Sequence, residues 1–430
     1  MSDRLATVNA KSAKGWLLLA TALIAAAALV WFGVRWQFGN MLSELTSPTD
    51  PSSKHVASLA RQLAGSDPLA AWLSASVNRD FISPEKVDES VAAFKEVVLL
   101  SPNDYRWWIE LGRAAEQAGR LDLAQASFQR ATELAPAYAY PRWQFGNFLL
   151  RQGSADEAFA QLRKAAENNT TYREQVFSLA WDYFDHDPER VEALAADTPD
   201  ARVSLAYFYA ARAQASDSLR IWNTLDADQK AQNSQIAKTI AQAFTEKKFF
   251  RQGLEFSRQV GIDADAQLEA ITNPGFEKPV GNPEDNHYGW NVERGDNKLD
   301  INTDSSTKHS GNRSLRINFR TFVKPQLANP WQTVALRPGG KYTLRFWMRT
   351  ENLRSAGMPT IEVVEASEYR LLAASAAAAI GTNDWQEASV EFEVPENVDG
   401  VVVRLARAYC GDACPLVGIL WLDDFSLEGK

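Results

Sequence analysis

The hydrophobic pattern changes along the chain and divides it into an apolar start, a helical middle and a strand-rich end. From Trp16 to Val34, 19 consecutive residues include only one clearly polar side chain, Thr21. At about 1.5 Å per residue, a helix of that length spans roughly 28 Å, which matches the hydrocarbon core of a bilayer. The pattern therefore predicts a transmembrane helix over residues 15–36.

The charges that flank this span predict its orientation. Arg4, Lys11 and Lys14 precede it, whereas only Arg35 follows before Lys54. Because positive residues stay on the cytoplasmic side, residues 1–14 are expected in the cytoplasm and the rest of the chain in the periplasm or outside the cell. A cleaved signal peptide is the alternative. The apolar run is longer than the hydrophobic region of a signal peptide. Its small residues lie inside the run and not after it, where a cleavage site would be, which favours a retained anchor.

The segment that follows the span has the composition of a linker. Residues 40–54 are rich in Ser, Thr and Pro and show no apolar period. Such clusters mark turns and connecting segments. We therefore predict a linker over residues 37–66.

From Asp67 the apolar residues recur at helical spacing, and the pattern itself repeats every 34 residues, which is typical of a helical repeat array. The equivalent positions are Ser90, Ala124 and Ala158; Phe94, Phe128 and Leu162; Val97, Ala131 and Ala165; and Pro102, Pro136 and Thr170. The most regular copy contains Trp108, Leu111, Gly112, Ala115, Ala124, Phe128, Ala131 and Pro136.

This copy resembles the tetratricopeptide repeat, in which small residues let two helices cross closely and a large apolar residue fills the gap between them. The resemblance covers about residues 68–260 and is weaker in its second half. It implies an all-α superhelix over residues 67–265 whose concave face binds a protein partner and carries out no chemistry. Arg106, Arg113 and Gln117 are the candidate partner contacts, with an ordinary solvated helix face as the alternative.

After residue 270 the chain consists of short runs in which apolar and polar residues alternate. The runs are RSLRINF, KYTLRFWMR, TIEVVEA, ASVEFEVP and GVVVRLARAY, separated by turn sequences such as RPGG and ENVDG. Alternation of this kind predicts an all-β sandwich or jelly roll over residues 270–430. The expected fold class is therefore multidomain, with a helical superhelix and a jelly-roll sandwich behind one transmembrane helix.

Five stretches of this segment, taken in order, resemble the jelly-roll carbohydrate-binding modules that accompany xylanases and cellulases. They are NPGFE, HSGNRSLRINF, LRPGGKYTLRFWMRT, DWQEASVEFEVP and LWLDDFSL. The resemblance spans residues 271–428. It implies that the first and last strands meet and that a structural calcium ion joins them.

Carried over to this sequence, the resemblance assigns Glu277 and Asp424 as calcium ligands, with the carbonyls near Lys308 and Gly311 completing the shell. Hard oxygen ligands from distant segments suit calcium. The alternative is that both acids cap strand ends. Asp423 is expected to face the opposite side, because neighbouring strand residues alternate.

A sugar site needs an aromatic face with planar polar side chains beside it. Alternation in YTLRFWMR places Tyr342, Leu344, Phe346 and Met348 in the core and leaves Trp347, between Arg345 and Arg349, on the outer face. Trp347 is therefore the first candidate platform. Further candidates are Glu362 and Arg404, with Trp331, Tyr369 and Tyr409 as weaker ones. For Trp347 the alternative is packing on the outer face. Trp290, Trp385 and Trp421 align with structural aromatics of the resembling modules and are expected in the core.

Composition and charge exclude several classes of protein. With 45 basic and 54 acidic side chains, the chain offers no electrostatic footprint for nucleic acid. Cys410 and Cys414 are too few for a zinc site and are expected to form a small disulfide loop in an oxidising compartment. The four histidines show no metal-ligand spacing, and no nucleophile elbow, phosphate loop or dinucleotide motif occurs. We therefore expect a protein that is not an enzyme.

These patterns favour a membrane-anchored extracytoplasmic scaffold that binds an envelope protein through its helices and a polysaccharide or oligosaccharide through its sandwich. Assembly or export of cell-surface polysaccharide is the expected setting. The alternative is a purely protein-binding assembly factor whose sandwich is a spacer or a second protein-binding face. An unrecognised glycan hydrolase ranks third, because it would need two facing carboxylates about 5–10 Å apart.

Overall fold

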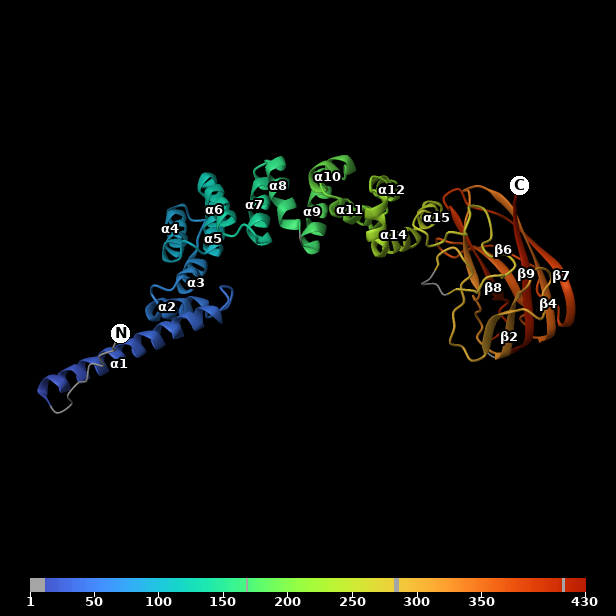
Figure 1. Ribbon diagram of the computed structural model, residues 1–430, viewed down its shortest axis with the longest axis horizontal. Coiled ribbons are helices and arrows are strands. Elements are labelled where there is room, and N and C mark those ends of the chain that lie inside the picture. The colour runs from blue at the N-terminus through green and yellow to red at the C-terminus, as the bar shows by residue number, and fades with distance from the viewer. Residues whose placement is uncertain (1–11, 168, 282–285, 412–413) are drawn as a thin grey trace, which may run out of the picture. The chain divides into compact units, whose positions relative to one another are not determined.

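The computed structural model describes residues 12–167, 169–281, 286–411 and 414–430. The chain divides into two compact units, Met1–Leu179 and Ala180–Lys430, which are described separately. The expected cytoplasmic segment 1–14 lies almost entirely outside the described residues. Figure 1 follows the order of elements from α1 to β9.

The first unit is helical. Its helices are α1 Ala13–Glu44, α2 Ser53–Leu63, α3 Pro68–Asn78, α4 Pro84–Leu100, α5 Tyr105–Gln117, α6 Leu121–Leu134, α7 Ala139–Arg151 and α8 Ala155–Ala166, and α9 Thr170–Tyr183 crosses into the second unit. The remaining helices are α10 Pro188–Ala195, α11 Pro199–Ala211, α12 Ala215–Asn223, α13 Ala227–Gln232, α14 Ser234–Glu246 and α15 Phe250–Gln259.

Small residues allow the paired helices of the array to approach closely. A Cβ atom on Gly112 of α5 would lie 3.0 Å from the ring of Phe128 on α6, and one on Gly146 of α7 would lie 2.6 Å from Cγ of Leu162 on α8. Phe128 and Leu162 are fully buried. The large residue of each 34-residue copy therefore packs directly on the small residue of its partner helix, as the repeat pattern predicts.

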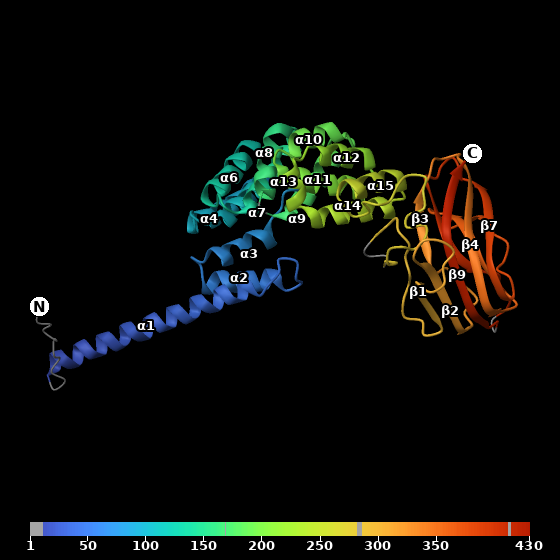
Figure 2. The same ribbon diagram turned by 45° about the vertical axis from the view of Figure 1, so that its right-hand side comes forward.

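The segment 37–66, predicted as a linker, is mostly helical. Helix α1 continues through the predicted span to Glu44, and α2 packs against its C-terminal part (Figure 2). A Cβ atom on Gly39 would lie 2.5 Å from that of Ala64, so the two helices touch where both residues are small. The Ser, Thr and Pro residues form only the short turn between α1 and α2. The predicted linker is therefore confined to this turn, because the composition of the turn does not describe the helices on either side of it.

The second unit ends in a sandwich of two antiparallel sheets. Its strands are β1 Leu299–Asp304, β2 Ser314–Phe322, β3 Trp331–Ala335, β4 Lys341–Arg354, β5 Pro359–Glu365, β6 Leu371–Ala374, β7 Gly381–Glu393, β8 Gly400–Arg407 and β9 Leu416–Gly429. One sheet has the order β1-β2-β9-β4-β7 and the other β3-β8-β5-β6. Tyr342, Leu344 and Phe346 of β4 lie in the core between them, as alternation predicted, with Met348 packed against it.

Helix α15 packs on the outer face of the four-stranded sheet. Phe250 and Leu254 form a buried cluster with Ala335 of β3, Val402 of β8 and Val364 of β5. Because these three strands are neighbours, the first turn of the helix lies over the sheet near one end of the strands. Figure 2 shows α15 beside β3.

Hydrogen bonds fix this junction as well. The carboxylate of Asp399 accepts from the backbone N–H groups of Phe250, at 3.2 Å, and Arg251, at 2.9 Å, at the start of α15. The hydroxyl of Tyr288 donates to the carbonyl of Phe250 at 2.8 Å. The last helix of the array and the sandwich therefore share one buried interface.

Candidate functional site

An aromatic ring and a planar ion pair lie in one row on the outer face of the four-stranded sheet. Trp331 of β3 is the cross-strand partner of Arg404 on β8, and Arg404 is the partner of Glu362 on β5. Two N–H groups of the Arg404 guanidinium donate to one carboxylate oxygen of Glu362, at 2.8 and 3.0 Å. All three side chains keep part of their surface accessible. The row therefore combines a ring with donors and acceptors for hydroxyl groups.

One edge of this row is set by the junction with α15. Trp331 packs against the cluster that contains Phe250 and Leu254. Tyr369, in the loop between β5 and β6, is exposed, and the Nζ atom of Lys248 lies 5.8 Å from the centre of its ring. Residues of the helical segment, such as Lys248 and Phe250, therefore lie beside the sheet residues on this side of the sandwich.

Trp347 lies on the outer face of the other sheet, with Arg345 and Arg349. The structure therefore separates these three candidates from Glu362 and Arg404, and the six predicted sugar contacts do not form one site. One face of Trp347 is covered by the ring of His309, which stacks on it at 3.9 Å and 15°. Arg349 approaches Asp384 at 3.4 Å. One face of the Trp347 ring is therefore not free to stack on a sugar, which its sequence position did not predict.

Two of the three tryptophans expected in the core lie elsewhere. Trp290 is in the core. Trp421 is buried, but it alternates with core residues Leu420 and Leu422, and its indole N–H donates to Asp304 at 2.9 Å on the outer face. Trp385 is only half buried and meets His309 edge to face. The expectation was wrong for Trp385, whereas Trp421 is buried as expected but on the outer side of its sheet.

Three carboxylates gather where the first and last segments of the sandwich meet. Glu277 accepts from the backbone N–H of Asn312 at 2.7 Å, and this bond holds the pKa of Glu277 below its usual value. Asp424 approaches His309 Nδ1 at 2.6 Å and accepts from the hydroxyl of Ser310 at 2.7 Å. Segment 309–312 is therefore held by both ends of the domain.

Asp423 points to the same segment, contrary to the expectation from alternation. Its carboxylate accepts from the backbone N–H of His309 at 2.8 Å. The register of β4 and β9 shifts here, and Asp424 adopts φ 49°, so the strand carries a bulge that breaks the alternation. Asp423 is fully buried, and this burial raises the pKa of its carboxyl group.

The carboxylates of this junction are ligands of the type that a hard cation takes. A Cβ atom on Gly275 would lie 3.6 Å from an oxygen of Asp423 and 3.6 Å from an oxygen of Asp424, with Glu277 beside them. These oxygens currently face N–H and O–H donors, and no group of three or more His, Cys, Asp or Glu arranged for a metal occurs among the described residues. Glu277 and Asp424 are the residues that would hold calcium, which prefers carboxylate and carbonyl oxygens.

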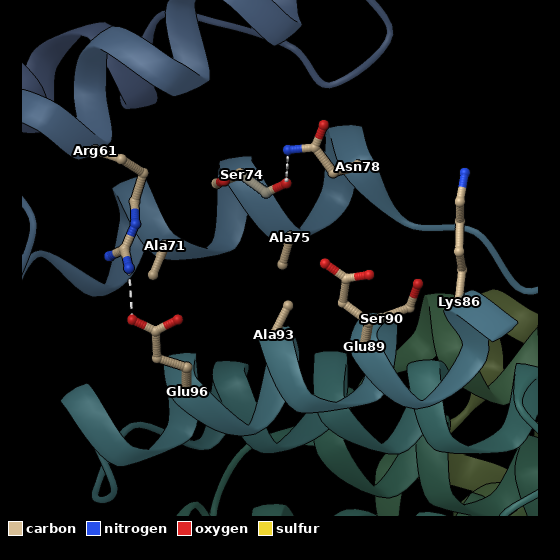
Figure 3. Close-up of a pocket in the computed structure, with 10 residues that line it drawn as sticks. All are labelled: Arg61, Ala71, Ser74, Ala75, Asn78, Lys86, Glu89, Ser90, Ala93 and Glu96. Carbon is tan, nitrogen blue, oxygen red and sulfur yellow. Dashed lines mark hydrogen bonds and ion pairs between the residues drawn. The ribbon is translucent and has the colours of Figure 1, made fainter.

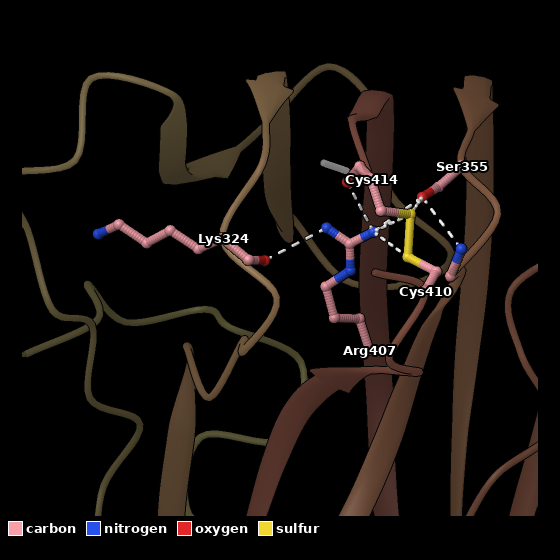
Figure 4. Close-up of a disulfide and its surroundings, with 6 residues drawn as sticks. Lys324, Ser355, Arg407, Cys410 and Cys414 are labelled. Atoms are coloured by element: carbon pink, nitrogen blue, oxygen red, sulfur yellow. Dashed lines mark hydrogen bonds between the residues drawn. A yellow bond between two sulfur atoms is a disulfide. The ribbon is translucent and has the colours of Figure 1, made fainter. Parts of the chain in front are cut away.

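Cys410 and Cys414 form the expected disulfide, which packs around a buried arginine (Figure 4). The Arg407 guanidinium donates to the Sγ atoms of both cysteines at 3.0 Å and to the hydroxyl of Ser355 at 2.9 Å. Burial lowers the pKa of Arg407. The disulfide loop therefore orders the end of β8 against the turn that follows β4.

The structure brings together two of the three predicted protein contacts in the helical array. Arg113 and Gln117 line a hollow of about 530 Å³ together with Phe81 and Arg151. Arg113 pairs with Glu110 at 2.8 Å and donates to the hydroxyl of Tyr140 at 2.9 Å. Arg106 does not line the hollow. It pairs instead with Asp104, the N-cap residue of its own helix.

A second groove, of about 410 Å³, lies between α3 and α4 (Figure 3). Its floor contains Ala71, Ala75 and Ala93, and an ion pair between Arg61 and Glu96 closes one end. No sequence motif marks this groove. Alanines at helical spacing indicate only that helices pack closely there.

The structure places Trp331, one of the weaker sequence candidates, in one row with Arg404 and Glu362. It was a weaker candidate because the course of its loop could not be predicted. The pairing of β3 with β8, which joins residues far apart in the sequence, places it beside Arg404. No local pattern reveals that pairing.

Comparison with known protein families gives two matches. Residues 268–408 match the model of a carbohydrate binding domain, and residues 105–138 match that of a tetratricopeptide repeat. The chain combines a tetratricopeptide repeat with a carbohydrate-binding domain. The residues that match the carbohydrate-binding domain include Trp331, Trp347, Glu362, Arg404 and Glu277, whereas Asp423 and Asp424 lie beyond the end of the match. A search of curated proteins found no match.

Solved structures with some similarity to the chain include carbohydrate-binding modules, a repeat protein and cyclases from Fischerella sp.. A structure described as "CBM4 structure and function" is 15% identical over 37% of this chain and 99% of its own, with a TM-score of 0.28. YrrB, described as a TPR protein with an unusual peptide-binding site, is 20% identical over 39% and 88%, with a TM-score of 0.28. The CBM22-1 xylan-binding domain from Paenibacillus barcinonensis Xyn10C is 13% identical over 36% and 91%, with a TM-score of 0.25. At such low TM-scores, none of the three supports a conclusion about this chain.

Proposed function

We propose that this protein is a membrane-anchored extracytoplasmic scaffold without catalytic activity. In this proposal, the carbohydrate-binding domain binds a polysaccharide or oligosaccharide of the cell surface, the helical array binds an envelope protein, and the setting is polysaccharide assembly or export. Helix α1 supports the anchor by its length of 32 residues and its apolar composition. Its cytoplasmic N-terminus follows from the flanking charges.

The row of Trp331, Arg404 and Glu362 carries the proposal for the glycan. A sugar ring placed on Trp331 would present its hydroxyl groups to a guanidinium and a carboxylate that already hold each other in place. A pair that is fixed before binding loses little side-chain entropy on binding, which favours affinity. The site therefore lies on the four-stranded sheet and not at Trp347.

Trp331→Ala is expected to weaken glycan binding by about tenfold or more, equivalent to about 1.4 kcal/mol, because it removes the stacking face. The measurement is a glycan array probed with the full-length chain in a detergent that lacks a sugar headgroup, so that the detergent does not compete. Trp347→Ala is the matched control and should bind like the wild type.

Each other outcome has a distinct meaning. Loss of binding in Trp347→Ala alone would move the site to the five-stranded sheet. Absence of binding to any glycan, by a chain that circular dichroism shows to be folded, would favour the purely protein-binding assembly factor.

Calcium at Glu277 and Asp424 is expected to stabilise the carbohydrate-binding domain, because the ion would link its first and last segments. At a calcium concentration 100 times the Kd, binding adds about 2.7 kcal/mol to the free energy of unfolding. For a unit of this size, that corresponds to roughly 5 °C or more in Tm. Calorimetry with calcium and with chelator tests this.

Asp424→Asn should abolish the difference between calcium and chelator. Asparagine tolerates the positive φ of this position, so the backbone is preserved. Asp384→Asn, a change at an exposed carboxylate of β7, is the control and should retain the full response. An identical Tm with calcium and with chelator in the wild-type chain would exclude the ion.

A further inference from the structure

Helix α1 carries an exposed apolar stripe that extends past the end of the predicted membrane span. Val34, Phe38, Met41 and Leu45 are 51%, 54%, 40% and 77% exposed. Their spacing of four, three and four residues places them on one side of the helix. Phe38, Met41 and Leu45 follow Arg35, so this part of the stripe lies on the extracytoplasmic side of the span.

The opposite side of the same helix is already occupied. Gly39 and Ser43 are buried, and the side-chain amide of Asn40 donates to Asp67 at 2.9 Å, just before α3. Helices α2 and α3 both pack on the end of α1 (Figure 2). At 100° per residue, the stripe residues lie on the side of α1 opposite the buried Gly39 and Ser43. The stripe is therefore not covered by the helices that pack on α1.

The stripe continues through the membrane span in the same heptad register. The positions that precede Val34 at alternating spacings of three and four are all apolar: Leu17, Ala20, Ile24, Ala27 and Trp31. Inside the span this is uninformative, because nearly every residue there is apolar. Beyond Arg35 the register is more informative. Phe38, Met41 and Leu45 keep the heptad spacing, and the other positions are Gln37, Gly39, Asn40, Ser43 and Glu44, with Trp36 and Leu42 as the two large apolar residues off the stripe.

We propose that a second copy of this chain covers the stripe, and that two α1 helices form a parallel, left-handed coiled coil. The proposal rests on the membrane anchor proposed above. All copies inserted with the same topology lie parallel in the bilayer, so identical stripes face each other in register. Nine seam positions from each helix bury an area on the order of 1,500 Å² in total, which is the size of a specific interface.

The two parts of this seam contribute differently. Within the bilayer, packing of Ala20 and Ala27 lets the helices approach, but lipid is as apolar as the side chains and gives no hydrophobic drive. Outside the hydrocarbon core, Phe38, Met41 and Leu45 leave water on pairing, so this part supplies the hydrophobic drive. The helical arrays of the two copies would then be joined at their membrane-proximal ends.

Single cysteines test the seam in the full-length chain, because both native cysteines are joined to each other and leave no free thiol. In vesicles, mild oxidation should convert Met41→Cys and Leu45→Cys into disulfide-linked dimers on a non-reducing gel. Trp36→Cys is the matched control, because this residue is also exposed but lies on the side opposite the stripe. It should remain monomeric.

Carbonate extraction of the same vesicles separates the two proposals. If the chain stays in the membrane and crosslinks equally at positions 36, 41 and 45, or at none of them, the proposed dimer is wrong. The anchor is not affected by that result. A chain that carbonate removes overturns the anchor and, with it, the parallel pair. Crosslinking confined to positions 41 and 45 in a chain that stays in the membrane supports the pair.

Leu45→Asn provides a second measurement that does not depend on thiols. Leu45 is the most exposed residue of the stripe, so the change should leave the fold intact while it places a polar group in the seam. Sedimentation in detergent should shift from dimer toward monomer. A wild-type chain that sediments as a monomer at all concentrations, with its stripe covered by lipid or detergent, contradicts the proposal.

Discussion

Phe250→Ala should separate the helical array from the carbohydrate-binding domain and lower the free energy of unfolding at their junction by about 3–5 kcal/mol. Phe250 is 2% exposed, and its ring lies so close to Gly400 that a Cβ atom there would come within 2.7 Å. Removing the ring leaves a cavity between α15 and the sheet. The hydrogen bonds that Asp399 accepts and Tyr288 donates use backbone atoms of α15, so the variant can still form them.

Calorimetry of the full-length chain in detergent measures this effect. In the wild type, α14, α15 and the sandwich should unfold together, whereas the variant should show separate transitions. Glu255→Ala, an exposed change on the same helix, is the control and should leave the profile unchanged. Unaltered cooperativity in Phe250→Ala would mean that the two parts are joined by the chain connection and not by packing.

Phe128→Ala should destabilise the first unit by a similar amount, about 3–5 kcal/mol. The ring is fully buried, contacts the backbone of α5 at Gly112, and lies 5.2 Å from the ring of Phe148 on α7. It therefore joins two successive helix pairs. Because a repeat array is stabilised mainly by contacts between neighbours, loss of one such contact weakens the array on both sides of it.

Hydrogen exchange of α5, α6 and α7 is the measurement for this variant, since a chain of several domains does not unfold in two states. Phe128→Leu should cost less than about 1.5 kcal/mol, because a change that nearly conserves volume is tolerated, and Leu162 occupies the equivalent position of the next copy. Gln125→Ala, at an exposed position of α6, should have little effect. Equal losses in the alanine and leucine variants would contradict the packing role.

If glycan binding is on the four-stranded sheet, the Phe250 junction has a functional consequence. Trp331 packs against the cluster that Phe250 helps to form. Detachment of α15 would remove support from the proposed platform without touching Arg404 or Glu362. Phe250→Ala is therefore expected to weaken glycan binding as well as stability.

The sequence by itself determined the class of each segment. The apolar run of α1, the 34-residue helical period and the alternation in the strands are local periodicities, set by 3.6 residues per helical turn and two per strand repeat. They predicted the helical array, the sandwich and the core side of β4 correctly. They also gave the family resemblance, because motifs such as NPGFE and LDDF are contiguous in the chain.

Only the tertiary structure decided which of these residues meet. Strand order β3-β8-β5-β6 brings Trp331, Arg404 and Glu362 together and leaves Trp347 on the other sheet. This order depends on pairings between distant segments, and neighbouring residues carry no record of them. A single bulge at Asp424 directs Asp423 toward the loop at His309, which Asp424 also contacts. Small residues let α1 and α2 pack as a helical pair where a linker was predicted. In each case the deciding contact is non-local, whereas periodicity in the sequence reports only local geometry.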